Sequence, residues 1–86
     1  MVHNLKIRKP YFDAIINGTK TFEVRKNDRG FKVGDIVDLE EIDDDGYTLR
    51  YIVVEITYIL DDPQYCLPGY VIFAFKLRLD KGVATT

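Results

Sequence analysis

The residues with the clearest capacity for chemistry lie in one charged stretch of the sequence, Gly18-Thr-Lys-Thr-Phe-Glu-Val-Arg25. If its second half is a β-strand, alternation places Phe22 and Val24 on one face and Thr21, Glu23 and Arg25 on the other. We expect the apolar pair to face the core. An arginine held by a carboxylate presents a fork of donors that suits a phosphate group or the edge of a base, so the charged face is a candidate binding site.

Further charged residues crowd around this strand. Lys20 lies at its start, and Lys26 and Arg29 follow it closely, between two glycines, Gly18 and Gly30, that let a ligand approach the backbone. This density favours a binding surface for an anion. A solvated strand face with an ordinary Glu–Arg pair, worth at most about 1 kcal/mol, explains the same residues, and the pattern by itself leaves both interpretations open.

The elements on either side must position this stretch. Alternation over His3–Arg8 predicts a strand with Leu5 and Ile7 inward, and Pro10 then suits the first turn of a short helix over residues 11–17. Gly18 ends that helix, and the charged strand is expected to run over residues 20–26 as far as a turn at 27–30. The apolar side of the helix is expected to consist of Phe12, Ile15 and Ile16.

The second half of the chain predicts three more strands, over residues 36–42, 47–60 and 70–79. The first two are joined by Asp43-Asp-Asp-Gly46, which favours a tight hairpin turn. The strand over 47–60 is long, and we expect it to be bent or bulged. Asp38 and Glu40 are expected to lie on an acidic outer face. The period of two predicts these inward-facing residues: Val37, Leu39, Ile52, Val54, Ile56, Tyr58, Val71, Phe73, Phe75 and Leu77.

These elements fit a single small domain over residues 1–79, followed by a flexible tail over 80–86. With 86 residues, of which 47% are apolar and 30% charged, the composition is that of an ordinary folded domain. Five or six strands with one short helix predict a mostly β (α+β) fold. We expect a small β barrel whose open end is plugged by the helix.

The net charge of −2 hides a strong segregation of charge along the chain. Residues 1–34 carry a net charge of +5, residues 35–62 carry −9, and residues 63–86 carry +2. A phosphate-bearing ligand responds to the local field more than to the total charge, so the basic first segment is compatible with an anionic partner. Side-by-side packing of the two halves, with mutual neutralisation, accounts for the same pattern.

The sequence argues against several other classes of site. Cys66 is the single cysteine and His3 the single histidine, so an internal disulfide is excluded and a zinc site is disfavoured. We expect His3 to be a surface or strand-end residue and Cys66 to be a small buried or loop residue. The acidic turn at 43–46 lacks the remainder of a calcium-binding loop and is expected to be a solvated hairpin. No metal or other cofactor is expected.

The sequence also contains no membrane-targeting signal that we recognise. The N-terminal residues lack the apolar run of a signal peptide, and no stretch approaches the roughly 20 apolar residues of a membrane helix. We therefore expect a cytoplasmic protein with no membrane partner.

The pattern Gly18-x-Lys20-x-x-Glu23-x-Arg25 resembles the G-x-K-x-x-E-x-R signature of the ASCH domain, a branch of the PUA-like superfamily. Its surroundings are similar to a small group of bacterial and phage ASCH-like proteins of unassigned function. The resemblance covers nearly the whole chain. The segments that carry it, besides the signature itself, are His3-x-Leu5-Lys6, Tyr11-Phe12, the run from Lys26 to Arg29, Phe31-x-Val33-Gly34-Asp35 and Pro68-Gly69-Tyr70-Val71-Ile72.

The resemblance implies a PUA-like β pseudo-barrel with a cleft beside the signature strand that binds RNA or a nucleotide. Lys20, Glu23 and Arg25 would line the cleft. Lys20 has the parity of the core-facing residues, so it must reach the cleft from the start of the strand, where the turn at Gly18 redirects it. The remaining expected ligand-binding residues are an adjoining rim of Lys26, Asn27, Asp28 and Arg29, with Lys6 and Tyr11 as neighbours.

One ASCH branch is similar to an amidohydrolase that removes the acyl group from N4-acetylcytidine with a lysine, a threonine and a later glutamate. Lys20 matches that lysine. Glu23 occupies the position of the threonine, although Thr21 is near, and no position here matches the later glutamate. A lysine that acts as a base must be neutral, a state that the neighbouring cations favour and Glu23 opposes.

Three functions therefore follow as hypotheses. The leading one is a nucleic-acid-binding module, for RNA rather than DNA, that grips phosphate and an unstacked base beside Lys20, Glu23 and Arg25. The second is an amidohydrolase with Lys20 and Thr21 as catalytic residues. The third is a non-catalytic protein-interaction domain that works through the acidic segment 35–62. The ligand, the oligomeric state and the pathway stay open.

Overall fold

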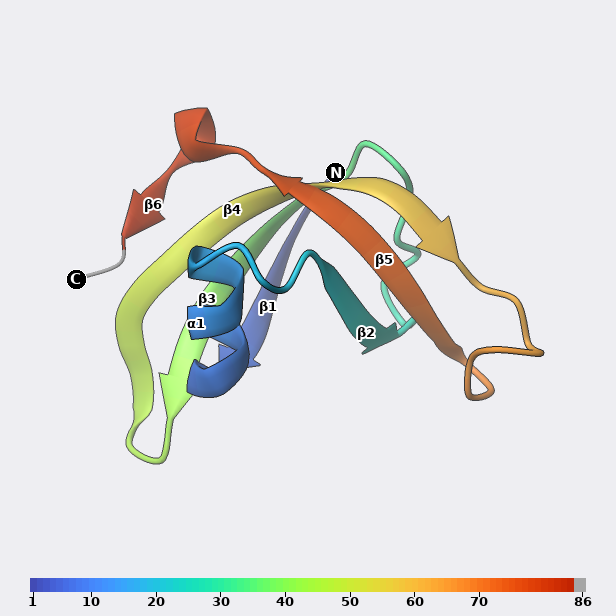
Figure 1. Cartoon of the computed structure of the whole chain (residues 1–86), viewed down its shortest axis with the longest axis horizontal. Coiled ribbons are helices and arrows are strands. Elements are labelled where there is room, and N and C mark those ends of the chain that lie inside the picture. Colours follow the sequence, from blue (N-terminus) through green and yellow to red (C-terminus); the bar gives the residue numbers. More distant parts are fainter. Residues whose placement is uncertain (85–86) are drawn as a thin grey trace.

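The computed structural model describes residues 1–84 and consists of one strongly curved sheet with a single short α-helix (Figure 1). The fold is a mostly β pseudo-barrel with a short helix, as the sequence predicts. In chain order the elements are β1 (Val2–Arg8), α1 (Lys9–Ile16), β2 (Phe22–Lys26), β3 (Ile36–Asp43), β4 (Gly46–Leu60), β5 (Tyr70–Leu77), the 3-10 turn η1 (Leu79–Lys81) and β6 (Val83–Ala84).

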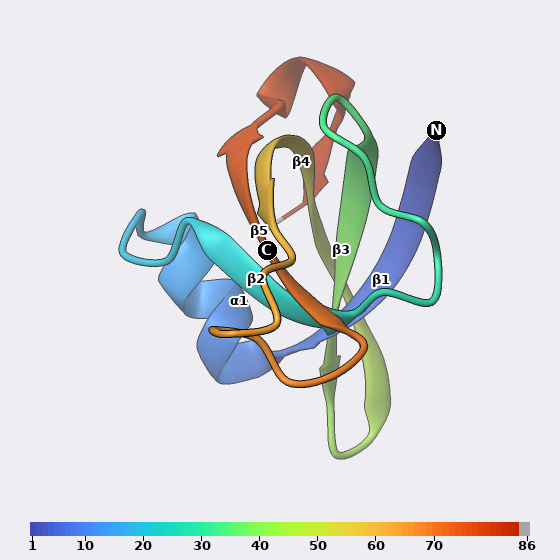
Figure 2. The same ribbon diagram turned by 90° about the vertical axis from the view of Figure 1, so that its right-hand side faces the viewer.

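The strands follow the spatial order β1-β3-β4-β5-β2, and β6 pairs with β4 away from this path. β1 and β3 are parallel, and the other pairs are antiparallel. β1 and β2 are consequently the edge strands at the two ends of this path. α1 lies inside the curve of the sheet and contacts β1 and β3 (Figure 1 and Figure 2).

The core lies inside the curl, and alternation within the strands produces it. Leu5 and Ile7 of β1 are buried as predicted, and Phe12 and Ile15 of α1 are 0% and 1% exposed. Burying these side chains removes apolar surface from water, which is the main favourable term in folding. The predicted strand residues that join them are Val37, Leu39, Ile52, Val54, Ile56, Val71, Phe73 and Phe75.

Outside β2, three residues predicted to face the core are exposed instead. Ile16 is at the end of α1 and is 36% exposed, because the helix stops there and the chain turns away through Asn17 and Gly18. Leu77 ends β5 and is 40% exposed. Tyr58 is 63% exposed because the pairing of β4 with β5 shifts between Ile56 and Tyr58, which moves the tyrosine to the other face.

The long strand β4 is bulged, as predicted. Its hairpin with β3 closes at the pair Asp43–Gly46, where Gly46 has a φ of 110° that a side chain would strain. The β3–β4 register then shifts between Glu40 and Ile42, and Leu49 adopts a φ of 73°, which is unusual for a leucine. These irregularities bend β4 so that one strand pairs with β3, β5 and β6.

The C-terminal segment differs from the predicted flexible tail over 80–86. Residues 79–81 form η1, and Val83 and Ala84 pair with Ile52 and Tyr51 of β4. The β4 edge beside η1 offers unpaired backbone groups, and β6 satisfies them. Residues 85 and 86 lie outside the described part of the chain.

His3 is buried and is therefore not a surface residue, one of the two predictions made for it, although it does lie at the start of β1 as the other predicted. It is 5% exposed, its Nε2 lies 2.8 Å from Oδ2 of Asp35, and its ring packs edge-on against Phe31. Asp35 also accepts hydrogen bonds from the backbone N–H of Lys32 at 3.0 Å and from the Met1 amino group at 3.4 Å. Burial opposes ionisation of Asp35, but the His3 and Lys32 hydrogen bonds outweigh it and lower the pKa of this carboxyl.

Candidate functional site

The charged strand β2 presents the opposite face to the one predicted. Phe22 and Val24, expected in the core, are 45% and 53% exposed, whereas Glu23 is 5% exposed. The register explains the inversion, because Glu23 and Arg25 pair with Phe73 and Val71 of β5. Residues directly opposite in an antiparallel pair share a face, and both β5 partners are core residues. The carboxylate and the guanidinium therefore point into the curl.

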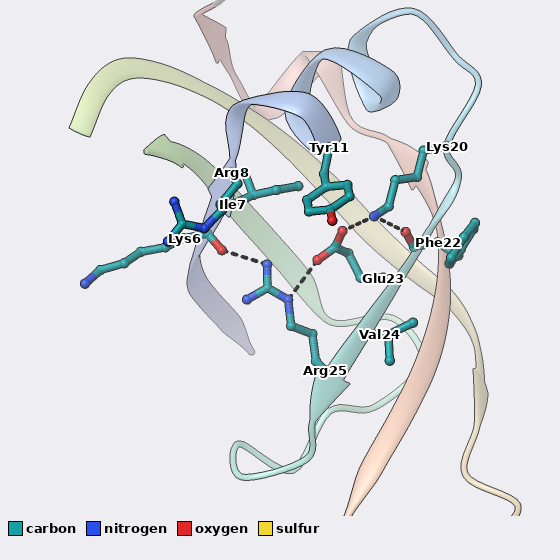
Figure 3. A pocket seen from close by; sticks show the side chains of 9 residues that line it. All are labelled: Lys6, Ile7, Arg8, Tyr11, Lys20, Phe22, Glu23, Val24 and Arg25. Atoms are coloured by element: carbon teal, nitrogen blue, oxygen red, sulfur yellow. Dashed lines mark hydrogen bonds and ion pairs between the residues drawn. The ribbon is translucent and has the colours of Figure 1, made fainter. Parts of the chain in front are cut away.

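A cleft of about 600 Å³ lies where β1 and β2 face each other. Figure 3 shows its side chains: Glu23 and Arg25 point from β2 toward β1, and Phe22 and Val24 point away from them. α1 closes one end through Tyr11. The residues that line the cleft are Lys6, Ile7, Arg8, Tyr11, Lys20, Phe22, Glu23, Val24 and Arg25.

Glu23 is the centre of the cleft's polar contacts. Its Oε2 accepts a hydrogen bond from Nε of Arg25 at 2.8 Å, and its Oε1 is bonded by the Lys20 ammonium. Lys20 also donates to the carbonyl of Phe22 at 2.6 Å. Burying a carboxylate this deeply is costly unless it is paired, and its bonds to Lys20 and Arg25 fix the orientation of both cations.

The turn after α1 brings Lys20 to this position. Gly18 adopts a φ of 83° and bonds back to the carbonyl of Ile15, which reverses the chain at the end of the helix. The backbone N–H groups of Thr19 and Lys20 then both donate to the carbonyl of Ala14 at 3.0 Å. The expectation that the Gly18 turn redirects Lys20 into the cleft is confirmed.

The boundary between β1 and β2, which we call the seam, is crossed by arginine side chains. Nη2 of Arg25 donates to the carbonyl of Lys6 at 2.7 Å, and Nη1 of Arg29 donates to the carbonyl of Asn4 at 3.2 Å. Both carbonyls belong to the edge strand β1. Within residues 1–84, β1 and β2 are not paired by backbone hydrogen bonds, so the hydrogen bonds of these side chains join the two strands instead.

The lining of the cleft is strongly cationic. Lys6, Arg8, Lys20 and Arg25 contribute four positive charges, against the single carboxylate of Glu23. The Lys20 ammonium also lies over two aromatic rings, at 5.7 Å from the centroid of Tyr11 and 5.1 Å from that of Phe22. A concave wall with this balance of charge concentrates anions at its mouth.

The structure brings together five of the predicted site residues: Lys6, Tyr11, Lys20, Glu23 and Arg25. The predicted rim over residues 26–29 lies outside the lining. There Asn27 is a structural residue, accepting from the N–H of Phe31 at 3.1 Å and donating its own N–H to Gly69 at 2.8 Å. Oδ1 of Asp28 lies 3.9 Å from Nε of Arg29, and Arg29 itself bonds across the seam. Lys26 is exposed.

Thr21, predicted as a catalytic residue, is also outside the lining. It precedes β2, is exposed, and contributes its carbonyl to the N–H of Phe75. The lining residues that the sequence prediction missed are Ile7, Arg8, Phe22 and Val24. Alternation in β1 does place Arg8 on the side of Lys6, so that one of the four was recoverable from the pattern.

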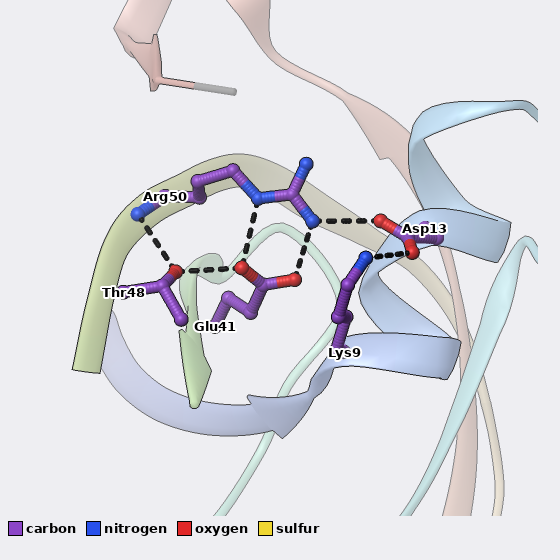
Figure 4. A network of polar contacts seen from close by, with 5 residues as sticks. All are labelled: Lys9, Asp13, Glu41, Thr48 and Arg50. Atoms are coloured by element: carbon purple, nitrogen blue, oxygen red, sulfur yellow. Dashed lines mark hydrogen bonds and ion pairs between the residues drawn. The ribbon is translucent and has the colours of Figure 1, made fainter. Parts of the chain in front are cut away.

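A second polar network lies on the other side of α1 (Figure 4). Glu41 is 2% exposed and accepts from Thr48 Oγ1 at 2.6 Å and from Nε and Nη2 of Arg50 at 2.8 and 2.5 Å. Nη2 of Arg50 also donates to Oδ1 of Asp13 at 2.7 Å, and Nζ of Lys9 donates to Oδ2 of Asp13 at 2.7 Å. The Arg50 hydrogen bonds lower the pKa of Glu41. This network joins α1 to the β3–β4 hairpin, so we assign it a structural role.

Residues 1–84 contain no group of three or more histidine, cysteine, aspartate or glutamate side chains placed to hold a metal ion. No helix in the same range has the length and apolar character needed to cross a bilayer.

Comparison with known proteins places the chain in a family. Residues 2–75 match the domain of unknown function DUF3850. The chain belongs to this family. A phage relative is similar as well, the "Uncharacterized 12.9 kDa protein in GpA 3'region" of Escherichia phage P2, at 35% identity over 60 residues, which is 70% of this chain and 55% of the relative. The chain thus matches about half the length of that relative. All the residues that line the cleft, and the strands β1 and β2, lie within the DUF3850 match.

Proposed function

We propose that this DUF3850 domain is an ASCH-like, PUA-like module that binds RNA, gripping a phosphate and one unstacked base in the cleft between β1 and β2. The observation that carries the proposal is the arrangement around Glu23. A buried carboxylate fixes Lys20 and Arg25 side by side in a cleft where cations outnumber carboxylates by four to one.

The contacts of Arg25 leave part of its fork available. Nε is used by Glu23 and one hydrogen of Nη2 by the Lys6 carbonyl, while Nη1 has no hydrogen-bond partner within residues 1–84. Such an arginine offers donors in a fixed plane to phosphate oxygens. Lys6 and Arg8 are exposed on the facing strand and supply further positive charge.

The cleft also contains an aromatic surface for a base. Tyr11 is 55% exposed at the end of the cleft, in the first turn of α1. Sequence-tolerant binding of single-stranded RNA combines such stacking surfaces with cations that follow the backbone. Phosphate contacts release counterions, so the affinity is expected to fall as salt is raised.

The test is fluorescence anisotropy with a labelled single-stranded RNA octamer at 50 and 200 mM salt. We expect salt-sensitive binding by the native chain and a loss of at least tenfold when both exposed cations are removed in Lys6→Gln/Arg8→Gln. Lys81→Gln removes a charge from η1, outside the cleft, and serves as the matched control. Absence of salt-sensitive binding, or equal losses in the two variants, would contradict the proposal.

The same cleft supports a second candidate, hydrolysis of an acylated nucleoside such as N4-acetylcytidine. It is supported by the position of Lys20, its candidate base, in the lining of the cleft. The buried Glu23 carboxylate that pairs with Lys20 opposes the neutral amine that the reaction needs. The position of Thr21 outside the cleft counts against it. The reaction would release the carboxylic acid and cytidine, which chromatography detects. We expect Lys20→Ala to abolish turnover if the candidate is right, and no turnover by the native chain would exclude this substrate.

A further inference from the structure

The outer face of the sheet beside the cleft carries a group of exposed aromatic and aliphatic side chains from three neighbouring strands. Phe22 of β2 pairs with Ala74 of β5, which pairs with Tyr58 of β4. Opposed residues share a face, so the rings of Phe22 and Tyr58 lie on either side of the small Ala74. Their strands are about 10 Å apart, which is two interstrand spacings. The other members of this face are Val24, Leu60, Tyr70 and Ile72, and we call the whole set the outer apolar face.

This face is exposed to an extent that requires explanation. Tyr58 is 63% exposed, Phe22 45% and Tyr70 38%, and the three lie on adjacent strands of one surface. Scattered apolar residues are normal on a protein surface, but contiguous patches mark a binding site. The inversion of β2 and the register shift in β4 both act in the same direction, since each turns an aromatic ring outward.

The charges at the border indicate what kind of partner this face accepts. Lys26 pairs in register with Tyr70, is exposed, and has no carboxylate partner within residues 1–84. Lys76 is 60% exposed at the opposite end, where Glu55 lies 3.9 Å away and is already bonded by Arg78. Asp61 and Asp62 follow β4 at one corner, so a polyanion would cross on the β2 and β5 side. Rings bordered by cations match bases and phosphates.

We propose that the outer apolar face is a stacking surface for single-stranded RNA, continuous with the cleft over the β2 edge. The inference rests on the proposed function of the cleft and adds to it that the ligand is a strand of several nucleotides. Phe22 belongs to both surfaces, since it lines the cleft beneath Lys20 and begins the row that ends at Tyr58. One base binds in the cleft, and the next ones stack on Phe22, Tyr58 and Tyr70.

The experiment measures anisotropy with labelled RNA of two lengths, a dinucleotide and an octamer, using the native full chain and the variants Tyr58→Ala, Tyr70→Ala and Tyr65→Ala. Tyr65 is the matched control, an exposed tyrosine on the loop between β4 and β5. We expect the octamer to bind at least tenfold more tightly than the dinucleotide. We expect Tyr58→Ala and Tyr70→Ala each to weaken octamer binding by about 5- to 100-fold. Tyr65→Ala should leave octamer binding nearly unchanged, and all three variants should bind the dinucleotide about as well as the native chain does.

The outcomes separate the two proposals. If the dinucleotide and the octamer bind equally and Lys6→Gln/Arg8→Gln weakens both, the cleft function stands and the stacking surface is wrong. If the native chain binds neither RNA, both are wrong. Sedimentation of the native chain and Tyr58→Ala provides the remaining check: self-association that disappears in the variant would identify the outer apolar face as an interface between copies of the chain and overturn the inference.

Discussion

Replacing Arg50 with alanine is expected to destabilise the domain strongly, although Arg50 lies outside the cleft. The guanidinium is the counter-charge of Glu41, which is 2% exposed. Among the described residues 1–84, the variant leaves this buried carboxylate with Thr48 as its remaining bonded side chain. It also removes the guanidinium that lies 4.8 Å from the ring centroid of Phe12 in α1.

The magnitude follows from the burial of the pair. Removing one partner of a buried ion pair costs about 3–5 kcal/mol, and we take about 3 kcal/mol because the Arg50 side chain is 21% exposed. For a domain of this size, that loss lowers the melting temperature by about 12–24 °C. Glu41→Gln removes the charge that needs a partner, so in that background Arg50→Ala is expected to cost only about 1 kcal/mol.

The pH dependence of this loss has a definite sign. Because the pKa of Glu41 is lowered in the folded state, mainly by the Arg50 hydrogen bonds, the carboxylate contributes stability above its unfolded value near 4.5 and loses it as the pH falls further. Urea unfolding of the native chain and Arg50→Ala at pH 7 and pH 3.5 measures the effect. The difference should be largest at pH 7. A difference below about 0.5 kcal/mol at pH 7, or an equal cost in the Glu41→Gln background, would refute the reasoning.

Three further predictions concern the rest of the fold. Asp35→Asn should lower stability at pH 7 and flatten its loss as the pH falls below about 4, since a carboxyl with a lowered pKa stabilises the fold only while ionised; urea titration at several pH values tests this. Gly46→Ala should cost about 1 kcal/mol or more, because its φ of 110° suits glycine alone, with Asp44→Ala as a neutral control in thermal melts. Phe73→Ala, at a side chain that is 0% exposed, should cost about 3–5 kcal/mol, and an unchanged denaturation midpoint would contradict the assignment of the core.

Much of the fold was predictable because its strands follow a period of two. Alternation located the apolar core residues of β1, β3 and β5, although it also included the exposed Leu77, and Asp43-Asp-Asp-Gly46 identified the hairpin. These signals are local, and in these segments the long-range contacts of the fold agree with the local preference. The same logic failed at Tyr58, because a register shift reverses parity and leaves no clear mark in a sequence.

The candidate site shows a different limit. Residue types located Lys20, Glu23 and Arg25 correctly, but hydrophobicity assigned Phe22 and Val24 to the core. Apolar side chains mark the inner face of a strand only where the outer face is in contact with water alone. In β2 the inner face lies at the seam, where charged side chains are bonded, and the apolar side chains lie on the outer face. The partnership of His3 with Asp35 was hidden for a related reason, since it joins residues 32 positions apart.

The seam between β1 and β2 has a consequence for solubility. Unpaired strand edges are templates on which other chains can add, and they are where sheet proteins begin to aggregate. Here the two edges face each other, and Arg25 and Arg29 occupy carbonyl groups of β1 that an incoming strand would otherwise bond. The arginines therefore protect the edge as well as shape the cleft. Variants that lose them should aggregate during refolding even where the folded domain keeps most of its stability.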